Sequence, residues 1–234
     1  MQFLIVDDDE NTLDYIANAF EVAWPEVRVL TASLGVESLK ILREKAPDAI
    51  LLDLGLPDIS GFDVIKNIRL TSNSPIMVIT AREEDSSIVK ALSLGADEYL
   101  VKPFGQLALI ARVKALVRRC ADEIQEPVIA YRTLSLNSST NELHYNETRI
   151  CLTNSEKQLL YELIIARGRT VTNRDLAERI YGTNMRTTLH TERDSHDAIK
   201  AYVYRLRRKI EVDYHNPRVI LNRPGIGYFL SPNL

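Results

Sequence analysis

Five polar residues stand at the ends of short apolar runs in the first half of the chain: Asp7, Asp8, Asp53, Thr80 and Lys102. Three carboxylates that gather in one place need a cation, and Mg²⁺ is a hard ion suited to carboxylates and to phosphate chemistry. A metal ion, a lysine ammonium and a threonine hydroxyl can together bind the oxygens of a transferred phosphoryl group. One carboxylate would then be the nucleophile and form an acyl phosphate.

The elements that would bring these residues together are five apolar runs that alternate with amphipathic segments of helical length. The runs are Phe3–Val6, Val27–Thr31, Ala49–Leu52, Ile76–Thr80 and Tyr99–Val101. This alternation predicts an α/β fold, a flavodoxin-like doubly wound sheet of five parallel strands in the order 2-1-3-4-5. Ligands of such sheets bind beyond the carboxyl ends of the strands, so we predict that the polar residues converge there.

The ordered motifs of the first half resemble the receiver domain of response regulators. The runs LIVDDDE, LLDLGLPDISGFDVI, VITA and GADEYLVKPF follow one another within residues 2–119. The resemblance implies that Asp53 is the phospho-acceptor and that a sensor histidine kinase is the donor. It also implies that Asp8 binds Mg²⁺ directly, that Asp7 acts mainly through water, and that Gly55 supplies a carbonyl ligand.

Three further roles come from the same resemblance. Lys102 is similar to the lysine that binds the phosphate, Thr80 to the switch hydroxyl, and Tyr99 to the aromatic residue that changes rotamer on activation. Pro103 follows Lys102 in the family's frequent cis arrangement. The receiver is expected to catalyse its own phosphoryl transfer and dephosphorylation, whereas the chain as a whole is not expected to be an enzyme.

The second half of the chain is basic where the first half is acidic. Residues 1–122 carry 13 Lys and Arg against 19 Asp and Glu, whereas residues 127–234 carry 16 against 11. This asymmetry indicates different partners for the two halves, with nucleic acid a candidate for the second. The segment Cys120–Pro127 has no apolar periodicity. We therefore predict a receiver at residues 1–119, a linker at 120–127 and a second domain at 128–234.

Residues 128–234 predict a small antiparallel sheet, two helices, a basic third helix and a terminal hairpin around Pro224. This order indicates a winged helix-turn-helix domain whose third helix enters the major groove of double-stranded DNA. The predicted strands are Val128–Tyr131, Leu134–Leu136, Glu142–Tyr145 and Arg149–Leu152. The first predicted helix begins near Thr153–Ser155. The second covers Arg174–Tyr181, after a turn at Thr170–Asn173. The third runs from about Ser195 to Val212, after a long polar loop, Thr183–Arg193.

The motifs LTNSEKQLLYELIIARGRTVTNRDLAERIYG, AYVYRLRRKIE and GIGYFL resemble the winged-helix domain of OmpR/PhoB-type regulators, over residues 128–231. By that likeness Lys200 and Tyr204 face bases, at positions where the family often has Asp and Arg. Arg223 would contact DNA from the wing, although the family usually places this arginine where Pro224 stands. The residues implied to contact phosphates are Tyr202, Arg205, Arg207 and Arg208.

The resemblance also implies that phosphorylation pairs two receivers and so places two third helices on paired half-sites. RNA polymerase is implied as a further partner. The family's pairing face joins the fourth helix, fifth strand and fifth helix. Ile88 and Ala108 replace one of its charge pairs here, which predicts a more apolar interface. The charged residues predicted for this face are Lys90, Asp97, Glu98, Arg112 and Arg118.

Two alternatives differ in mechanism. The chain could be a haloacid-dehalogenase-like phosphatase, because Asp7-Asp8-Asp9 contains an Asp-x-Asp motif. However, Asn11 stands where that family needs Thr or Val, and Lys102 follows Asp97–Glu98 instead of preceding them. The second alternative is a DNA-binding regulator of the same family that acts without phosphorylation. The intact acidic set argues against it.

The composition bears on location. The chain has 234 residues, of which 45% are hydrophobic, and this suits two ordinary globular domains. No apolar stretch approaches the ~18 residues that span a bilayer, and the start of the sequence does not have the form of a signal peptide. Cys120 and Cys151 lack metal-ligand or disulfide-framework spacing. We therefore expect a reduced cytoplasmic protein with no membrane partner.

Overall fold

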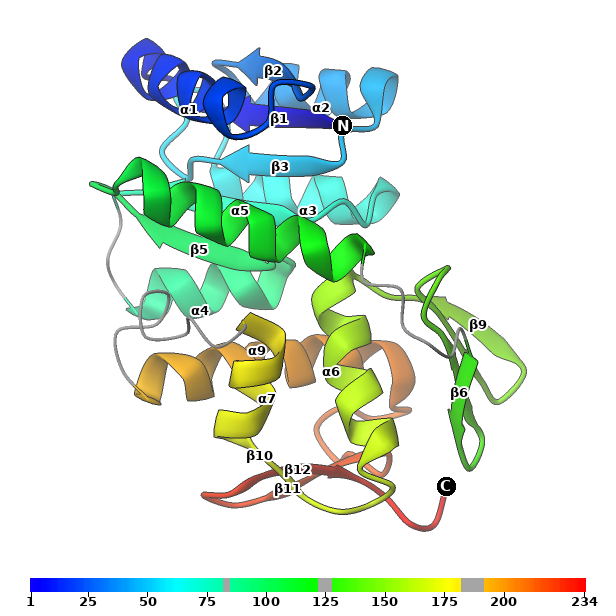
Figure 1. The fold of residues 1–234 in the computed structure, drawn as a ribbon. Helices are drawn as coiled ribbons and strands as arrows, with labels where there is room; N and C mark the ends of the chain where they lie inside the picture. The colour runs from blue at the N-terminus through cyan, green and yellow to red at the C-terminus, as the bar shows by residue number, and fades with distance from the viewer. Residues whose placement is uncertain (82–84, 122–127, 182–191) are drawn as a thin grey trace. The chain divides into compact units, whose positions relative to one another are not determined.

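The computed structural model describes residues 1–81, 85–121, 128–181 and 192–234. They form two compact units, Met1–Arg118 and Arg119–Leu234 (Figure 1). The last helix of the first unit, α5, continues to Ala121, so the first two residues of the segment predicted as linker are helical. The rest of that segment lies outside the described residues. Within the described ranges, no helix combines the length and the apolar character needed to cross a membrane.

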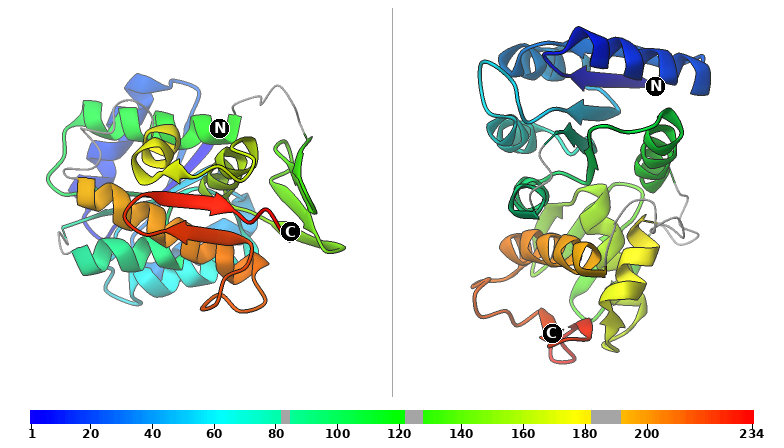
Figure 2. Two further views of the ribbon diagram at one scale, coloured as in Figure 1. Left: turned by 90° about the horizontal axis from the view of Figure 1, so that it is seen from below. Right: turned by 90° about the vertical axis from the view of Figure 1, so that its left-hand side faces the viewer.

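The first unit is a parallel sheet with the strand order β2-β1-β3-β4-β5, which confirms the predicted flavodoxin-like winding. Figure 2 shows α1 and α5 on one face of the sheet and α2, α3 and α4 on the other. The strands are β1 (Gln2–Val6), β2 (Arg28–Ala32), β3 (Ala49–Leu52), β4 (Ile76–Thr80) and β5 (Glu98–Val101). The helices are α1 (Glu10–Ala23), α2 (Gly35–Lys45), α3 (Gly61–Thr71), α4 (Asp85–Leu94) and α5 (Gln106–Ala121).

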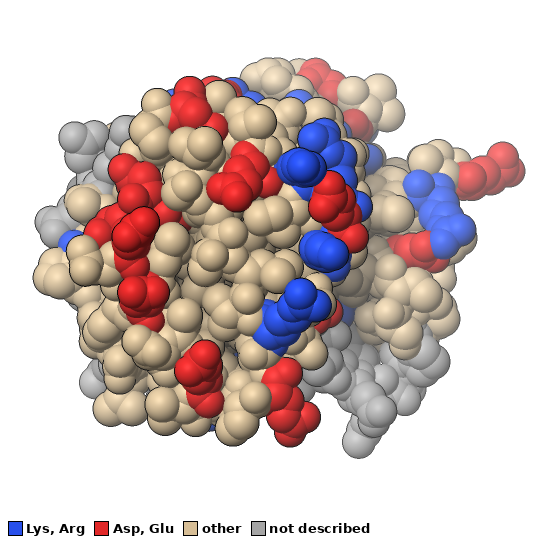
Figure 3. Space-filling view, turned by 90° about the horizontal axis from the view of Figure 1, so that it is seen from above, with Lys and Arg blue, Asp and Glu red and all other residues tan. Residues whose placement is uncertain are grey.

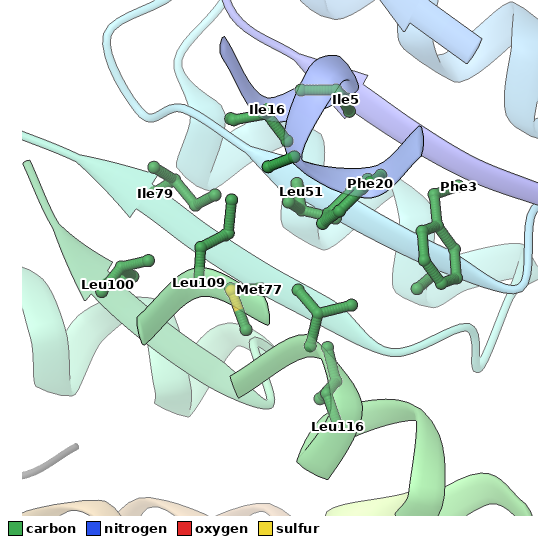
Figure 4. Close-up of a cluster of buried hydrophobic side chains, with 13 residues drawn as sticks. Phe3, Ile5, Ile16, Phe20, Leu51, Met77, Ile79, Leu100, Leu109 and Leu116 are labelled. Atoms are coloured by element: carbon green, nitrogen blue, oxygen red, sulfur yellow. The ribbon is translucent and has the colours of Figure 1, made fainter. Parts of the chain in front are cut away.

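The strand β1 is buried on both faces of the sheet. Phe3 and Ile5 point into the cluster that α1 and α5 cover, where Phe20 and Leu109 join them (Figure 4). Their neighbours in sequence, including Leu4, point to the opposite face and are equally buried. Helices on both faces explain why the strand runs in the sequence are continuously apolar instead of alternating.

Among its described residues, the second unit has an antiparallel meander in the order β6-β7-β8-β9, three helices, and a sheet in the order β10-β12-β11. The turn between β8 and β9, Asn146–Glu147, has two positive φ values, as the tight I′ hairpin turn requires. The strands are β6 (Val128–Tyr131), β7 (Leu134–Asn137), β8 (Glu142–Tyr145), β9 (Thr148–Cys151), β10 (Val171–Thr172), β11 (Ile220–Arg223) and β12 (Gly227–Leu230). The helices are α6 (Asn154–Ile165), α7 (Asn173–Tyr181) and α9 (Glu192–Ile210).

Two predictions for this unit were wrong in detail. The segment predicted as a turn before α7 contains the strand β10, in which Val171 pairs with Tyr228 of β12. The terminal hairpin therefore gains a third strand. The sequence did not indicate this strand, because it has only two residues and Val171 has polar neighbours. The helix α9 starts three residues earlier and ends two residues earlier than predicted. Most of the preceding loop, residues 182–191, lies outside the described residues.

Candidate phosphoryl-transfer site and DNA-binding surface

The register of β1 and β3 brings two of the predicted aspartates together. Val6 and Leu52 are partners in these parallel neighbours, so Asp7 and Asp53, which follow them, emerge side by side. The amide of Asp53 donates a hydrogen bond to the carbonyl of Val6 at 2.8 Å, which extends the ladder by one residue. Both aspartates are largely buried, with 2% and 9% of their surface exposed.

The neighbouring strands β4 and β5 place Thr80 and Lys102 at the same edge. Thr80 is the partner of Val101, and the amide of Lys102 donates to the carbonyl of Thr80 at 2.9 Å. The Lys102–Pro103 peptide bond is cis, as predicted. Topology and register are therefore sufficient to gather residues from positions 7 to 102 at one rim.

The ammonium of Lys102 joins the two buried aspartates. Its Nζ lies 2.6 Å from Asp7 Oδ2 and 3.1 Å from Asp53 Oδ2. The other oxygen of Asp53 accepts a hydrogen bond from the amide of Gly55 at 3.0 Å. Asp8 is exposed, and an oxygen of its carboxylate lies within 4.8 Å of oxygens of Asp7 and Asp53. Two carboxylates thus share the Lys102 ammonium, and a third lies beside them.

Burial and charge shape the protonation of this group. Burial raises the pKa of the Asp7 carboxyl above its ordinary value, and the hydrogen bond from Lys102 offsets only part of the rise. Burial also opposes the charge of Lys102, but its hydrogen bonds to Asp7 and Asp53 outweigh burial and raise the Lys102 pKa. Lys102 therefore stays protonated at neutral pH. The excess of negative charge suits a divalent cation.

The two predicted switch residues are buried. Thr80 is 2% exposed and Tyr99 is 7% exposed. The carbonyl of Tyr99 accepts a hydrogen bond at 2.7 Å from a guanidinium nitrogen of Arg112, which ties β5 to α5. Because Thr80 ends β4 and Tyr99 lies on the neighbouring β5, a change at the rim can reach both through adjacent strands.

The helix α9 presents an exposed stripe that combines charge with an aromatic ring. Lys200, Tyr204 and Arg208 are spaced four residues apart, so they share one face, and all three are exposed. The guanidinium of Arg208 lies 6.0 Å from the centre of the Tyr204 ring. A basic, exposed helix face of this kind fits the negative groove of a DNA duplex.

Comparison with known proteins agrees with both units. Residues 3–114 match the family described as response regulator receiver domain, and residues 147–230 match the family described as transcriptional regulatory protein, C terminal. The chain is 34% identical over 227 residues to the transcriptional regulatory protein KdpE of Mycobacterium tuberculosis (strain H37Rv), covering 96% of both chains. It belongs to the OmpR/PhoB family of response regulators.

Other relatives point the same way. The response regulator MprA of Mycobacterium avium is 35% identical over 233 residues and covers 98% of both chains. The crystal structure of DrrB, an OmpR/PhoB homologue from Thermotoga maritima, covers 98% of both chains at 27% identity, with a TM-score of 0.50. A mutant of RitR, 24% identical with a TM-score of 0.74 over 98% of both chains, shares the fold. The matched domains are those of transcription regulators, so the phosphatase alternative is not supported.

This response regulator buries two residues that were predicted to contact DNA phosphates. Tyr202 has no exposed surface and Arg205 is 6% exposed, so neither reaches a ligand on the face of α9. Arg205 instead lies 3.5 Å from the buried carboxylate of Glu156 on α6. The prediction for Arg205 came from the resemblance to the OmpR/PhoB family. The helical spacing gave a contrary signal for Tyr202 alone, because Tyr202 follows the core residue Ile199 by three positions and so lies close to the apolar face.

The remaining predicted DNA contacts fall into two groups. Arg207 is half-buried and donates two hydrogen bonds to the carbonyl of Ile220, at 3.1 and 2.7 Å, so it holds β11 against α9. Arg208 and Arg223 are exposed. The Arg223 guanidinium lies 5.9 Å from the centre of the Phe229 ring in the wing hairpin. Arg208 and Arg223 therefore stay candidates, whereas Arg207 has a structural role.

The predicted dimer face also needs correction. Asp97 is buried and pairs with Arg69 at 2.7 Å, a partner on α3 that the sequence did not reveal. Glu98 and Arg112 are buried as well and lie 3.6 Å apart. These charges are engaged inside one chain. Of the other residues predicted for the face, Lys90 is exposed, with its Nζ 4.1 Å from the centre of the Phe62 ring, and the side chain of Arg118 lies outside the described residues.

Proposed function

We propose that this response regulator is switched by transfer of a phosphoryl group from a sensor histidine kinase to Asp53, in the presence of Mg²⁺. The observation that carries the proposal is the pairing of Lys102 with both Asp7 and Asp53, beside a third carboxylate. A catalyst of phosphoryl transfer needs positioned positive charge and a nucleophile, and little else. Lys102 supplies the fixed charge, and Asp53 is the carboxylate held at 3.1 Å from it.

The residues at the rim fit a magnesium ion. Asp7, Asp8 and Asp53 offer hard oxygen ligands within 4.8 Å of one another, and the one ammonium paired with them among the described residues does not balance their charge. We assign direct ligation to Asp8 and Asp53, with the carbonyl of Gly55, and a contact through water to Asp7. A bound ion would supply neutralisation of the charge on the transferred oxygens. The Asp53 carboxylate attacks the phosphorus, the P–N bond to the kinase histidine breaks, and its imidazole takes up a proton as it leaves, while the Lys102 ammonium and the Thr80 hydroxyl bind the oxygens that gain charge.

The acidic character of the receiver makes the positive charge at the rim important for binding a phosphoryl donor. On the face that Figure 3 shows, acidic side chains are widely scattered, while basic side chains gather along one side. Residues 1–122 carry an excess of acids over bases. A phosphoryl donor is itself anionic, so its approach to such a protein depends on the positive charges placed at the rim.

The output follows from a shift between two receiver states. Phosphorylation stabilises the state in which Thr80 and Tyr99 have moved toward the phosphoryl group, since a ligand shifts a population only by differential contacts. In that state two chains pair, through a face that includes Lys90. The pair then binds two DNA half-sites through Lys200, Tyr204, Arg208 and Arg223. We place the protein in the cytoplasm, with RNA polymerase as a further partner.

The test compares three proteins: the wild-type chain, Asp53→Asn and Asp63→Asn. Each is treated with acetyl phosphate with and without Mg²⁺, and the acid-labile phosphoprotein is quantified. We expect labelling that requires Mg²⁺ in the wild type and in Asp63→Asn, whose carboxylate is exposed on α3, and none in Asp53→Asn. Affinity for a DNA site selected from random sequence should rise with labelling. Labelling or activation that persists in Asp53→Asn would place the switch elsewhere.

A further inference from the structure

An aromatic cluster extends from α9 into the turn that follows it. The Tyr204 ring is 39% exposed, and its edge contact with Tyr214 has a centroid distance of 5.7 Å at 89°. On its other side Tyr214 lies against His215, with ring centres 4.1 Å apart. Arg208, one turn along α9, is 6.0 Å from the Tyr204 ring centre. Tyr214 and His215 are outside the helix and belong to no site described above.

The segment that carries Tyr214 is held in place by hydrogen bonds at both ends. The carboxylate of Asp213 accepts the amide of His215 at 2.9 Å and the side-chain amide of Asn216 at 2.7 Å, which closes a tight turn. Farther along, Glu211 accepts the amides of Val219 and Ile220, at 3.0 and 2.9 Å, where the chain enters β11. A turn fixed in this way is a firm support for a ring that contacts its neighbour by an edge.

We propose that Tyr214 positions the Tyr204 ring so that it makes an apolar contact with the 5-methyl group of a thymine in the DNA site. The proposal rests on the proposed function, in which α9 lies in the major groove. The thymine methyl is the apolar group that base pairs display in that groove. Lys200 and Arg208 flank the ring on the same exposed stripe, so Arg208 would hold the phosphate backbone while the ring meets the base edge.

Preorganisation is what Tyr214 adds. An exposed tyrosine that rotates freely loses that freedom on binding, and the loss weakens the contact. A ring already held by an edge contact binds with less loss and discriminates better between bases. Tyr214 is therefore a positioning residue, and Tyr204 is the residue that touches the base.

The test uses the full chain and a duplex that it selects from random sequence. Each thymine of the selected site is replaced, one at a time, by deoxyuridine, which removes only the methyl group, and affinity is measured by fluorescence anisotropy. We expect one position in each half-site at which uracil weakens wild-type binding by about fourfold. Equal binding to thymine and uracil at every position overturns the proposal without a variant being made.

Variants then assign the effect to the two rings. Tyr204→Phe and Tyr214→Phe keep both rings and should keep the preference for thymine, whereas Tyr204→Ala and Tyr214→Ala should reduce it to below about 1.5-fold. The double alanine variant should match Tyr204→Ala alone, since the residues act as a unit. Val212→Ala is the control, because this side chain is fully exposed in the same segment.

Three outcomes would contradict the inference. Loss of the preference in Tyr204→Phe would mean that the hydroxyl reads the base, and retention in Tyr214→Ala would mean that Tyr214 does not position the ring. Retention in Tyr204→Ala would assign the methyl contact to another residue. Failure of the proposed DNA surface has a different signature, because the selection would enrich no site or Lys200→Ala and Arg208→Ala would leave overall affinity unchanged.

Discussion

Each unit of the chain contains a cluster of opposite charges, and the two clusters differ in how completely they are balanced. At the rim of the receiver, Asp7 and Asp53 share the Lys102 ammonium, and a third carboxylate, Asp8, lies beside them and is exposed. In the DNA-binding unit, the single carboxylate of Glu156 lies 3.5 Å from Arg205 and 2.7 Å from Lys209. The amide of Thr153 also donates to Glu156, at 2.9 Å, in a capping box that starts α6.

The comparison separates a reactive site from a structural one. The receiver cluster has surplus negative charge and an open side, so it stabilises an added cation and an added phosphoryl group. In the Glu156 cluster the carboxylate and Arg205 are buried and only Lys209 reaches solvent, so the cluster stabilises the contact between α6 and α9. Like residue types therefore support chemistry in one place and packing in the other, and the balance of charge decides which.

The largest expected effect is the loss of stability that follows removal of the Glu156 charge. Glu156→Gln keeps the size of the side chain but removes the negative charge that lies 3.5 Å from the buried Arg205. We expect the DNA-binding unit to lose about 3–5 kcal/mol of stability toward unfolding. The measurement is hydrogen exchange of α6 and α9 amides in the full chain. Trp24, the single tryptophan, packs against Phe3 and Phe20 in the receiver, and its fluorescence should report unchanged receiver unfolding.

A second variant, at an exposed ion pair, controls for the loss of any Glu–Arg pair. Glu178 pairs with Arg174 at 3.0 Å on the surface of α7, with 41% and 71% of their side chains exposed. Glu178→Gln should cost less than about 0.5 kcal/mol, because water screens exposed pairs. Equal losses in the two variants would mean that the Glu156 cluster is no more important than a surface pair.

The receiver cluster should show its largest response in the rate of phosphorylation. Lys102→Ala removes the ammonium that bridges Asp7 and Asp53, so the oxygens of the transferred group lose a fixed positive charge. We expect phosphorylation by acetyl phosphate to slow by about 10²–10³-fold. The rate is followed by phosphoprotein formation at saturating Mg²⁺. Lys66→Ala, at an exposed position on α3, should react like the wild type, and a wild-type rate in Lys102→Ala would remove Lys102 from the site.

Acid titration distinguishes the closed cluster by a different route. Burial alone would raise the pKa of Glu156, but the charges of Arg205 and Lys209 outweigh burial and hold this pKa below its ordinary value of 4.5. A depressed carboxyl pKa stabilises the folded state above the unfolded value, and the stabilisation is lost as the pH falls through the folded pKa. The stability of the DNA-binding unit toward unfolding should therefore decrease as the pH falls below about 4.5. In Glu156→Gln this part of the pH dependence should be missing. An identical pH profile in both proteins would contradict the assignment.

The sequence could predict the rim because its geometry depends only on topology. Once five strands alternate with helices, Asp7, Asp53 and Lys102 must lie beyond carboxyl ends at one edge, whatever the packing details. The buried ion pairs could not be predicted in this way. The family resemblance assigned Arg205 to a DNA contact and Asp97 to the dimer face, both of them surface roles. Their burial depends on partners far away in sequence, Glu156 and Arg69, whose pairing is decided by how the helices pack.

The smallest effect concerns the surplus charge itself. In the absence of Mg²⁺, Asp8→Asn removes one of the three carboxylates that crowd the rim, and the receiver should gain roughly 0.5–1 kcal/mol of stability. Urea unfolding followed by Trp24 fluorescence measures this gain. Asp14→Asn, an exposed position on α1, controls for a general change in net charge.

Magnesium should reverse the order of stability. The ion binds the folded wild type and so stabilises it in proportion to the logarithm of its concentration, whereas Asp8→Asn lacks a direct ligand and should gain little. The two unfolding curves should therefore cross as Mg²⁺ is added. If the wild type is the more stable protein without Mg²⁺, the carboxylates do not repel one another enough to matter. The receiver cluster would then be as well balanced as the cluster around Glu156, and the contrast between an open and a closed site would fail.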